Sequence, residues 1–358
     1  MRVEKIPLNI LLPALRAVAP GTLIREGIEN ILRAKTGGLL VFGDYPEVRS
    51  IVEGGFEINS PVTATRLYEL AKMDGAIILD EKAETIWKAN AQLVPQSAIA
   101  SDETGIRHRI AERVARQTGA MVIAISQRRS LITLYKGMLK YTLPDSGVIL
   151  TKANQAIQTL EKYRSVLEKA LVNLSILEFE EVVTVLDVAK VVQRVEMVKR
   201  IVGELDLYLA QLGVEGRLVN MQMEELMTNV FEDGNLVILD YVNTEEKDLA
   251  QINKNLRSLS SEELLELTAL SRIMGFGSSL SSLDMSVLPR GYRILNELPR
   301  LPFPVIENMI KYFGSLQKIL AATTEELDQV EGIGEVRAKA IKNGLTRLRE
   351  QVFLDRHF

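Results

Sequence analysis

The chain has 358 residues and a formal net charge of −4, with 47% hydrophobic and 25% charged residues, a composition typical of globular proteins. This length predicts two or three domains, each large enough to hold a hydrophobic core. The absence of cysteine excludes disulfide bonds, thiolate metal sites and cysteine nucleophiles. Two histidines, His108 and His357, are too few for a multi-histidine zinc site.

We expect neither a membrane span nor a cleavable signal in this sequence. An apolar stretch near the start is interrupted by Pro7 and Pro13 and is followed by Arg16, so it is too short to cross a bilayer. No other stretch reaches about 18 uninterrupted apolar residues. The lack of cysteine also fits a reducing compartment. We therefore expect a cytoplasmic protein that has no membrane partner.

Residues 1–145 combine helical patterns with short β-rich runs. Apolar residues at helical spacing fill 23–35, and a glycine pair follows as a stop signal. Two further helices are predicted over 63–73 and 107–118. We expect an α/β or α+β domain, a mixed sheet flanked by helices, over residues 1–145. The predicted strands are 38–42, 76–79, 85–87, 121–125 and 131–135.

Residues 146–288 have a different, helical pattern. Segments 153–174, 182–212 and 261–273 are rich in Leu, Val, Glu, Lys and Gln, with apolar residues three or four apart. Because 182–212 lacks proline, it predicts a single helix of about 45 Å. The Gly and Ser clusters in 272–288 are typical of a hinge or linker. We expect an all-α domain, a helical bundle or spine between the two ends of the chain.

Residues 289–358 are predicted to be helical in short pieces, and they carry the first specific motif. Over 327–341 a short helix, a Gly-Ile-Gly turn and a second helix resemble the helix-hairpin-helix motif of DNA repair and recombination proteins. Glycines let the backbone approach a phosphate, and N–H groups at the start of the second helix point at the anion. Such contacts read the DNA backbone and not the bases. The predicted DNA-binding residues are Gly332, Ile333, Gly334, Arg337 and Lys339.

A degenerate copy of the motif lies upstream, in residues 301–310. Pro302 and Pro304 stand where the glycines would be, and proline has no N–H to offer a phosphate. This copy is expected to complete a tandem helix-hairpin-helix fold while binding phosphate poorly. The alternative is that the glycine turn is an ordinary connection between two helices.

Two short strings in the N-terminal region carry a second resemblance: Asp74-Gly75-Ala76 before a predicted strand, and Thr104-Gly105-Ile106-Arg107-His108-Arg109 at the start of a predicted helix. Alone, Asp-Gly is a common turn and Arg-His-Arg a common solvated cationic face. Together and in this order they resemble the DGA and RHR motifs of the diadenylate cyclase family, which makes cyclic di-AMP from ATP. With its helical middle and its hairpin tail, the whole chain is similar to the DNA-integrity-scanning members of that family.

The resemblance implies roles for these residues. Asp74 would bind Mg²⁺ or Mn²⁺ as a hard oxygen ligand and help to deprotonate the 3′-hydroxyl of ATP. The arginine-histidine string opens a helix, where the helix dipole and the side chains favour a triphosphate. The implied catalytic residues are Asp74, Arg107, His108 and Arg109. The implied ATP-binding residues are Gly75, Ala76, Leu93, Thr104, Gly105, Ile106, Arg107, His108, Arg109, Ile110, Ser126 and Arg128.

Some of these assignments come from the resemblance alone. Leu93 would contact adenine, whereas its alternative is ordinary core packing. Ser126 and Arg128 would reach phosphate, whereas the alternative for Arg128 is a solvated turn. Ile110 departs from the family pattern, which has a small or hydroxyl residue there, so at most the backbone of Ile110 can serve.

The implied reaction joins two ATP molecules into cyclic di-AMP and releases two pyrophosphates. One site holding one ATP cannot close a symmetric ring of two nucleotides, so two cyclase domains must face each other in an isologous contact. The family arrangement extends this contact to an octamer with the DNA-binding tails outward. Branched DNA, bound without sequence preference, is expected to lower synthesis.

Two other classes of function stay open. One is a DNA repair or recombination scaffold whose N-terminal domain binds nucleotide without turning it over. Such a homologue is expected to lose the metal-binding carboxylate, and this chain keeps Asp74. The other is a purely structural coiled-coil assembly protein, which explains the middle of the chain but neither motif-bearing end.

Overall fold

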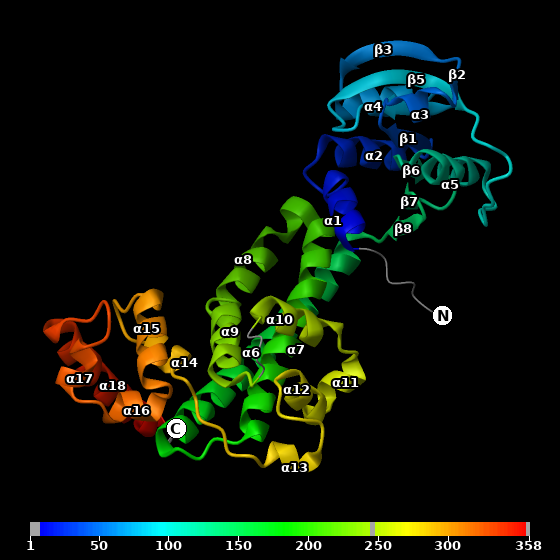
Figure 1. Ribbon diagram of the computed structural model, residues 1–358. Coiled ribbons are helices and arrows are strands. Elements are labelled where there is room, and N and C mark those ends of the chain that lie inside the picture. Colours follow the sequence, from blue (N-terminus) through cyan, green and yellow to red (C-terminus); the bar gives the residue numbers. More distant parts are fainter. Residues whose placement is uncertain (1–7, 244–247, 356–358) are drawn as a thin grey trace. The chain divides into compact units, whose positions relative to one another are not determined.

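The computed structural model describes residues 8–243 and 248–355 (Figure 1). The chain divides into two compact units, the first made of Met1–Ala156 and Glu204–Met221, the second of Ile157–Gly203 and Gln222–Phe358. The domain boundaries predicted after residues 145 and 288 stay predictions. His357 lies outside the described residues. Within the described ranges, no helix is both long and apolar enough to cross a membrane.

The first unit is built on one mixed sheet, as predicted. In its described part the strands run in the order β2-β5-β4-β1-β6-β7-β8, with β3 paired to β5. The β1–β4 pair is parallel and every other pair is antiparallel. The strands are β1 Gly38–Phe42, β2 Val52–Glu53, β3 Phe56–Pro61, β4 Ala76–Leu79, β5 Thr85–Leu93, β6 Met121–Ile125, β7 Ile132–Lys136 and β8 Leu139–Leu143.

Helices cover both faces of this sheet. Leu40 and Phe42 of β1 belong to the core under α1, α2 and α4, whereas Leu39 and Val41 belong to the core under α3 and α5. Alternate strand residues therefore feed opposite cores, which is why β1, β4 and β6 are apolar throughout. The helices are α1 Leu8–Ala17, α2 Leu23–Ala34, α3 Pro46–Arg49, α4 Ala64–Leu70 and α5 Ile106–Thr118.

The sequence patterns found the central strands and missed the outer ones. The strand predicted over 85–87 continues to Leu93, and β2, β3 and β8 were not predicted. β5 carries polar residues, pairs irregularly with β4 and holds Asn90 at a positive φ of 52°. β3 is mostly exposed and contains no continuous apolar run. These strands exist because they pair with neighbours, and local hydrophobicity does not reveal that.

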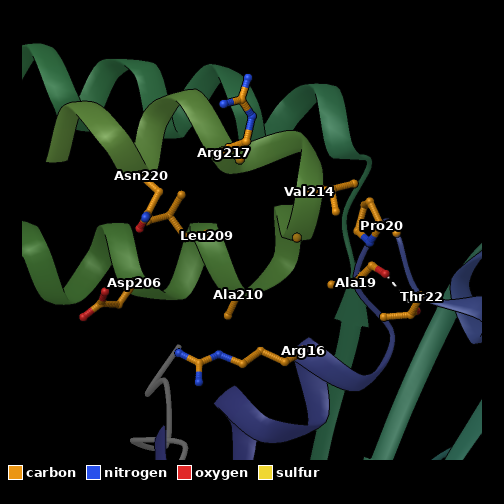
Figure 2. A pocket seen from close by; sticks show the side chains of 13 residues that line it. Arg16, Ala19, Pro20, Thr22, Asp206, Leu209, Ala210, Val214, Arg217 and Asn220 are labelled. Atoms are coloured by element: carbon orange, nitrogen blue, oxygen red, sulfur yellow. Dashed lines mark hydrogen bonds between the residues drawn. The ribbon is translucent and has the colours of Figure 1, made fainter. Parts of the chain in front are cut away.

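Two long helices follow the sheet: α6 Ser146–Glu180 and α7 Val185–Leu212, the latter inside the predicted 182–212. The end of α7 packs within the first unit, where Gly213, at a φ of 51°, begins the short helix η1 Gly213–Gly216 and turns the chain past Pro20. A Cβ on Gly213 would lie 2.2 Å from the carbonyl oxygen of Pro20, so only glycine fits. Val214 and Pro20 line a cavity of about 560 Å³ and are labelled in Figure 2. The N–H of Val214 donates to Pro20 O at 3.1 Å.

The second unit is helical. Part of the predicted hinge over 272–288 is ordered against the start of α7: the N–H of Val185 donates to Met285 O at 3.0 Å, and that of Val287 donates to Val183 O at 3.0 Å. The prediction of a hinge or linker over 272–288 stays a prediction. Besides parts of α6 and α7, the unit contains the part of α8 Arg217–Leu226 beyond residue 221, α9 Val230–Tyr241, α10 Leu249–Ser258, α11 Ser261–Leu265, α12 Leu267–Ile273, α13 Leu280–Leu283, α14 Tyr292–Asn296, α15 Phe303–Phe313, α16 Leu316–Ala321, α17 Thr324–Asp328 and α18 Glu335–Asp355.

The helices of the tail share a core with α6. Ile176 and Phe179 of α6 are buried in the cluster that also contains the apolar residues of α14 to α18. Beside it, the fully buried Glu178 accepts a hydrogen bond from Tyr241 Oη at 2.7 Å and forms an ion pair with Arg293 of α14. The tail is thus anchored to the long helix by apolar packing and by a buried charge pair.

Candidate functional site

The first turn of α5 is held by its flanking residues. Gly105 precedes the helix, and its carbonyl accepts the N–H of Arg109 at 2.9 Å. Ala111, Val114 and Ala115 are fully buried against the sheet, which fixes the rotation of the helix. The helix therefore presents its N-terminal N–H groups and the Arg-His-Arg string at its start, a favourable place for an anion.

A cavity of about 500 Å³ opens at this helix start. It brings residues of the loop before α5 and of its first turn together with the turn between β6 and β7. Seven of the predicted nucleotide-binding residues line it: Thr104, Gly105, Ile106, Arg107, His108, Ser126 and Arg128.

The remaining predicted residues lie outside the lining of this cavity. Leu93 is only 6% exposed and belongs to the core under α5, as does Ala76. Ile110 packs against the same core. Arg109 turns back to donate from Nε to the carbonyl of Glu103 at 3.2 Å.

Strand register nevertheless puts the Asp74-Gly75 turn at the same end of the sheet. Leu40 of β1 pairs with Ile77 of β4 in parallel, and Gly38 pairs with Ile125 at the end of β6. The starts of β1 and β4 and the end of β6 therefore share one sheet edge. Gly37 lies on that edge too, where an added Cβ would be 2.5 Å from Arg107 Nη1.

Sequence reasoning missed a carboxylate in the cavity. Glu103 Oε1 accepts Tyr135 Oη at 2.7 Å and lies 2.5 Å from Lys140 Nζ. Burial acts to raise the pKa of Glu103, but hydrogen bonds from Lys140 and Tyr135 outweigh it and lower that pKa. Its position directly before Thr104-Gly105 is the one feature of the sequence that could have pointed to Glu103. Its partners lie on β7 and β8, and nothing in the sequence near Glu103 indicates that they contact it.

The cavity is strongly cationic. Arg107, Arg128, Arg129 and Lys140 line it, and Glu103 is the one carboxylate in that lining. The pKa of His108, which lines it too, is lowered mainly by burial, with the neighbouring cations acting in the same direction and Glu103 opposing them. Such a cavity suits a ligand with several negative charges.

Asp74 could hold a hard divalent cation only together with oxygen atoms of a bound substrate. It is exposed, and among the described residues it has neither a hydrogen bond nor an ion pair. In the same ranges there is no group of three His, Asp or Glu residues that could hold a metal ion by itself. Mg²⁺ commonly uses one or two carboxylates together with substrate phosphates, and a single free carboxylate fits that pattern.

The hairpin of the tail is built around its two glycines. Gly332 has a φ of 86°, and Ile333 is only 7% exposed because its side chain enters the core. Gly334 is exposed, with no atom within 4 Å of an added Cβ, at the start of α18. Arg337 Nη1 donates to the carbonyl of Gly332, and Lys339 Nζ lies 2.5 Å from Glu335 Oε1 on the same helix.

A groove of about 880 Å³ borders this hairpin. Arg300, Arg337 and Arg347 line it together with Gly334. Sequence reasoning found Arg337 and missed the other two arginines. Arg300 lies in the loop between α14 and α15, and Arg347 lies further along α18. A phosphate at the hairpin would meet backbone N–H groups beside several guanidinium groups.

Relatives of the chain match it over nearly its whole length. A protein of Carboxydothermus hydrogenoformans named DNA integrity scanning protein DisA is 58% identical, with 98% of this chain and 99% of that protein covered. The chain belongs to the DisA family. Proteins of the same name from Clostridium botulinum and Clostridium kluyveri are 55% and 52% identical, covering 99% and 100% of this chain and all of each relative.

Family models match three consecutive stretches. Residues 25–139 match the DisA bacterial checkpoint controller nucleotide-binding family, residues 143–283 its linker region, and residues 315–343 the helix-hairpin-helix motif. Most residues that line the cationic cavity lie in the nucleotide-binding stretch, and the glycine hairpin lies in the third. The predicted architecture, a nucleotide-binding α/β domain, a helical middle and a hairpin tail, is therefore confirmed.

Two solved structures match part of the chain. A double mutant of DacA from Staphylococcus aureus is 18% identical, with a TM-score of 0.30 over 39% of this chain and 90% of that one. A hypothetical membrane spanning protein from Bacillus cereus is 23% identical, with a TM-score of 0.31 over 34% of this chain and 62% of that one.

Proposed function

We propose that the chain is a diadenylate cyclase that joins two ATP molecules into cyclic di-AMP and releases two pyrophosphates. In each half-reaction the 3′-hydroxyl of one ATP loses its proton, and its oxygen bonds to the α-phosphorus of the other. The bond from that phosphorus to pyrophosphate breaks. The observation that carries the proposal is the cation-lined cavity at the start of α5, on the sheet edge that also holds the Asp74-Gly75 turn.

The cavity would hold the triphosphate. Arg107 and Arg128 would make charge-assisted contacts, and the N–H groups at the start of α5 would add their dipole. The Lys140–Glu103 pair fixes the loop before the helix, so its backbone needs little rearrangement when ATP binds. A positioned polyphosphate, with water displaced from the cavity, is what an in-line displacement requires.

Asp74 would hold Mg²⁺ or Mn²⁺, and when bound the ion would offset the negative charge of the phosphates. Its carboxylate, free of other partners among the described residues, is available to accept the proton of a 3′-hydroxyl. Because a symmetric product needs two ATP molecules, two cyclase domains must face each other. We infer an isologous dimer contact of this kind, extended to an octamer.

The tail would bind branched DNA through its backbone phosphates. Gly334 leaves open space at the start of α18, and three arginines line the adjoining groove. We propose that DNA bound there lowers synthesis. The catalytic step depends on close alignment, and a misplacement of about 1 Å can cost roughly a hundredfold in rate.

The test is incubation of the full chain with ATP and Mn²⁺ or Mg²⁺, followed by chromatography for cyclic di-AMP. Asp74→Asn keeps the shape of the side chain and removes its charge, so we expect a loss of product of about a hundredfold or more. Asp284→Asn, at another exposed aspartate, serves as the matched control and should leave synthesis unchanged.

The outcomes separate the alternatives. If the wild type binds an ATP analogue but forms no cyclic di-AMP, the chain is a nucleotide-binding scaffold and the cyclase proposal fails. If a folded Asp74→Asn variant turns over normally, the metal assignment is wrong. If the rate of cyclic di-AMP synthesis is the same with junction DNA, with duplex DNA and without DNA, the coupling is refuted.

A further inference from the structure

The second unit contains another cation-lined groove, far along the chain from the hairpin. Three helices form it: α7 contributes Lys199, α9 contributes Phe231 and Asn235, and α10 contributes Asn253, Lys254 and Arg257. Its volume is about 590 Å³. Residues 231 and 235 are one turn apart, as are 253 and 257, so each helix turns one face to the groove.

Hydrogen bonds inside the groove engage its side-chain amide oxygens, whereas some of its N–H groups have no acceptor within the described part of the chain. Lys199 Nζ donates to Asn253 Oδ1 at 2.8 Å. Asn253 Nδ2 in turn donates to Asn235 Oδ1 at 3.1 Å and to the carbonyl of Leu249 at 3.0 Å. Both amide oxygens are therefore engaged, whereas Asn235 Nδ2 has no acceptor among the described residues. The lining offers N–H groups to a ligand and few oxygens.

The positive charges of the groove are not paired. Among the described residues, no carboxylate lies within 4 Å of the amino group of Lys199 or Lys254 or of the guanidinium of Arg257. Glu196, one turn before Lys199, is 3.6 Å from Arg200 instead. Burial lowers the pKa of Lys199, and nearby Arg257 lowers it further while Glu196 opposes them. Three cations in one groove repel one another, and an anion would relieve that repulsion.

An aromatic ring stands beside these cations. Phe231 lies in the first turn of α9 and is 42% exposed, so part of its ring is accessible to a ligand. Aromatic rings that border a cationic groove offer a stacking surface to planar bases. The groove therefore presents two complementary features, donors for an anion and a flat apolar face.

We propose that this groove binds a nucleoside phosphate, with its phosphate on Lys199, Lys254 and Arg257 and its base against Phe231. The volume suits one nucleotide rather than a stretch of duplex. The proposal is independent of the cyclase activity, because no residue of the groove belongs to the N-terminal site.

The test is photo-crosslinking of the full chain with 8-azido-ATP, followed by mapping of the labelled peptides by mass spectrometry. We expect label on the peptide that contains Phe231, in addition to any label near the N-terminal cavity. Arg257→Glu should reduce the label at Phe231 about tenfold or more and leave the N-terminal label unchanged. Lys190→Gln, at an exposed lysine on the same α7 helix, is the matched control and should change neither.

Competition identifies the ligand class. Unlabelled AMP should displace the label, and Phe231→Leu should weaken AMP about tenfold while leaving competition by inorganic phosphate unchanged. Absence of label at Phe231 in the wild type overturns the proposal, even when the N-terminal site is labelled. If inorganic phosphate and AMP displace the label equally well, the proposed base contact is wrong. If single-stranded DNA displaces the label at concentrations where AMP does not, the assignment to a nucleotide is wrong. Lys254→Gln repeats the test if Arg257→Glu misfolds.

Discussion

The buried ion pair between Glu178 and Arg293 gives a sharp test of how the tail is anchored. The side chains are 0% and 5% exposed, and Glu178 also accepts the hydroxyl of Tyr241 at 2.7 Å. Arg293→Met keeps the apolar length of the side chain but leaves a buried carboxylate without its cation. Removing one partner of a buried pair costs about 3–5 kcal/mol, which corresponds to a change of roughly a hundredfold to several thousandfold in a local opening equilibrium.

Hydrogen exchange followed by mass spectrometry measures this opening in the full chain. A single global unfolding free energy is not well defined for a chain of two units, so protection of the α14–α18 amides is the appropriate quantity. In Arg293→Met we expect the protection factors of the α14–α18 amides to fall by roughly a hundredfold to several thousandfold. Arg347→Met, at an exposed arginine of α18, is the control and should leave it within a few-fold of the wild type.

A double variant separates the charge effect from lost packing. Glu178→Gln removes the buried charge while its amide oxygen still accepts from Tyr241, so Glu178→Gln combined with Arg293→Met should recover most of the protection. A loss smaller than about tenfold in the single variant would refute the magnitude. A double variant less protected than Arg293→Met alone would refute the electrostatic reasoning, because the loss would then come from packing.

Four further variants test the two motif-bearing sites. Replacing Arg107 and Arg109 together by Ala should weaken an ATP analogue about tenfold or more in calorimetry, since the charge-assisted contact of Arg107 contributes about 2 kcal/mol and Arg109 holds the loop before α5 through the carbonyl of Glu103; unchanged affinity would make them a solvated face. Glu103→Gln should lower turnover about tenfold without weakening ATP binding, because the loop loses its ion pair while the cavity loses its one carboxylate; a rise in KM alone would contradict a positioning role. Gly334→Leu should reduce DNA affinity about tenfold in a gel shift with thermal stability unchanged, because its side chain enters open space, whereas Gly332→Leu should also destabilise the hairpin, because of the positive φ of Gly332.

Local patterns in the sequence determined several of the helices and the central strands. Strands β1, β4 and β6 are buried on both faces, so each is a short apolar run that is visible without any partner. The α5 helix was predicted as a helical stretch over 107–118, and its motif placed Arg107 at the helix start. The turn at Gly332 was likewise visible, because a glycine between two helical patterns predicts a backbone that other residues rarely adopt.

Only the tertiary structure decided the contacts between residues distant in sequence. Tyr135 meets Glu103 across 32 positions, and Arg293 meets Glu178 across 115. No periodicity links such pairs, since a charged or polar residue has the same local pattern whether it faces solvent or a buried partner. The groove around Lys199 likewise required three helices to pack together. The sequence thus specified each element through local backbone and burial preferences, whereas packing of the elements selected which polar side chains share a site.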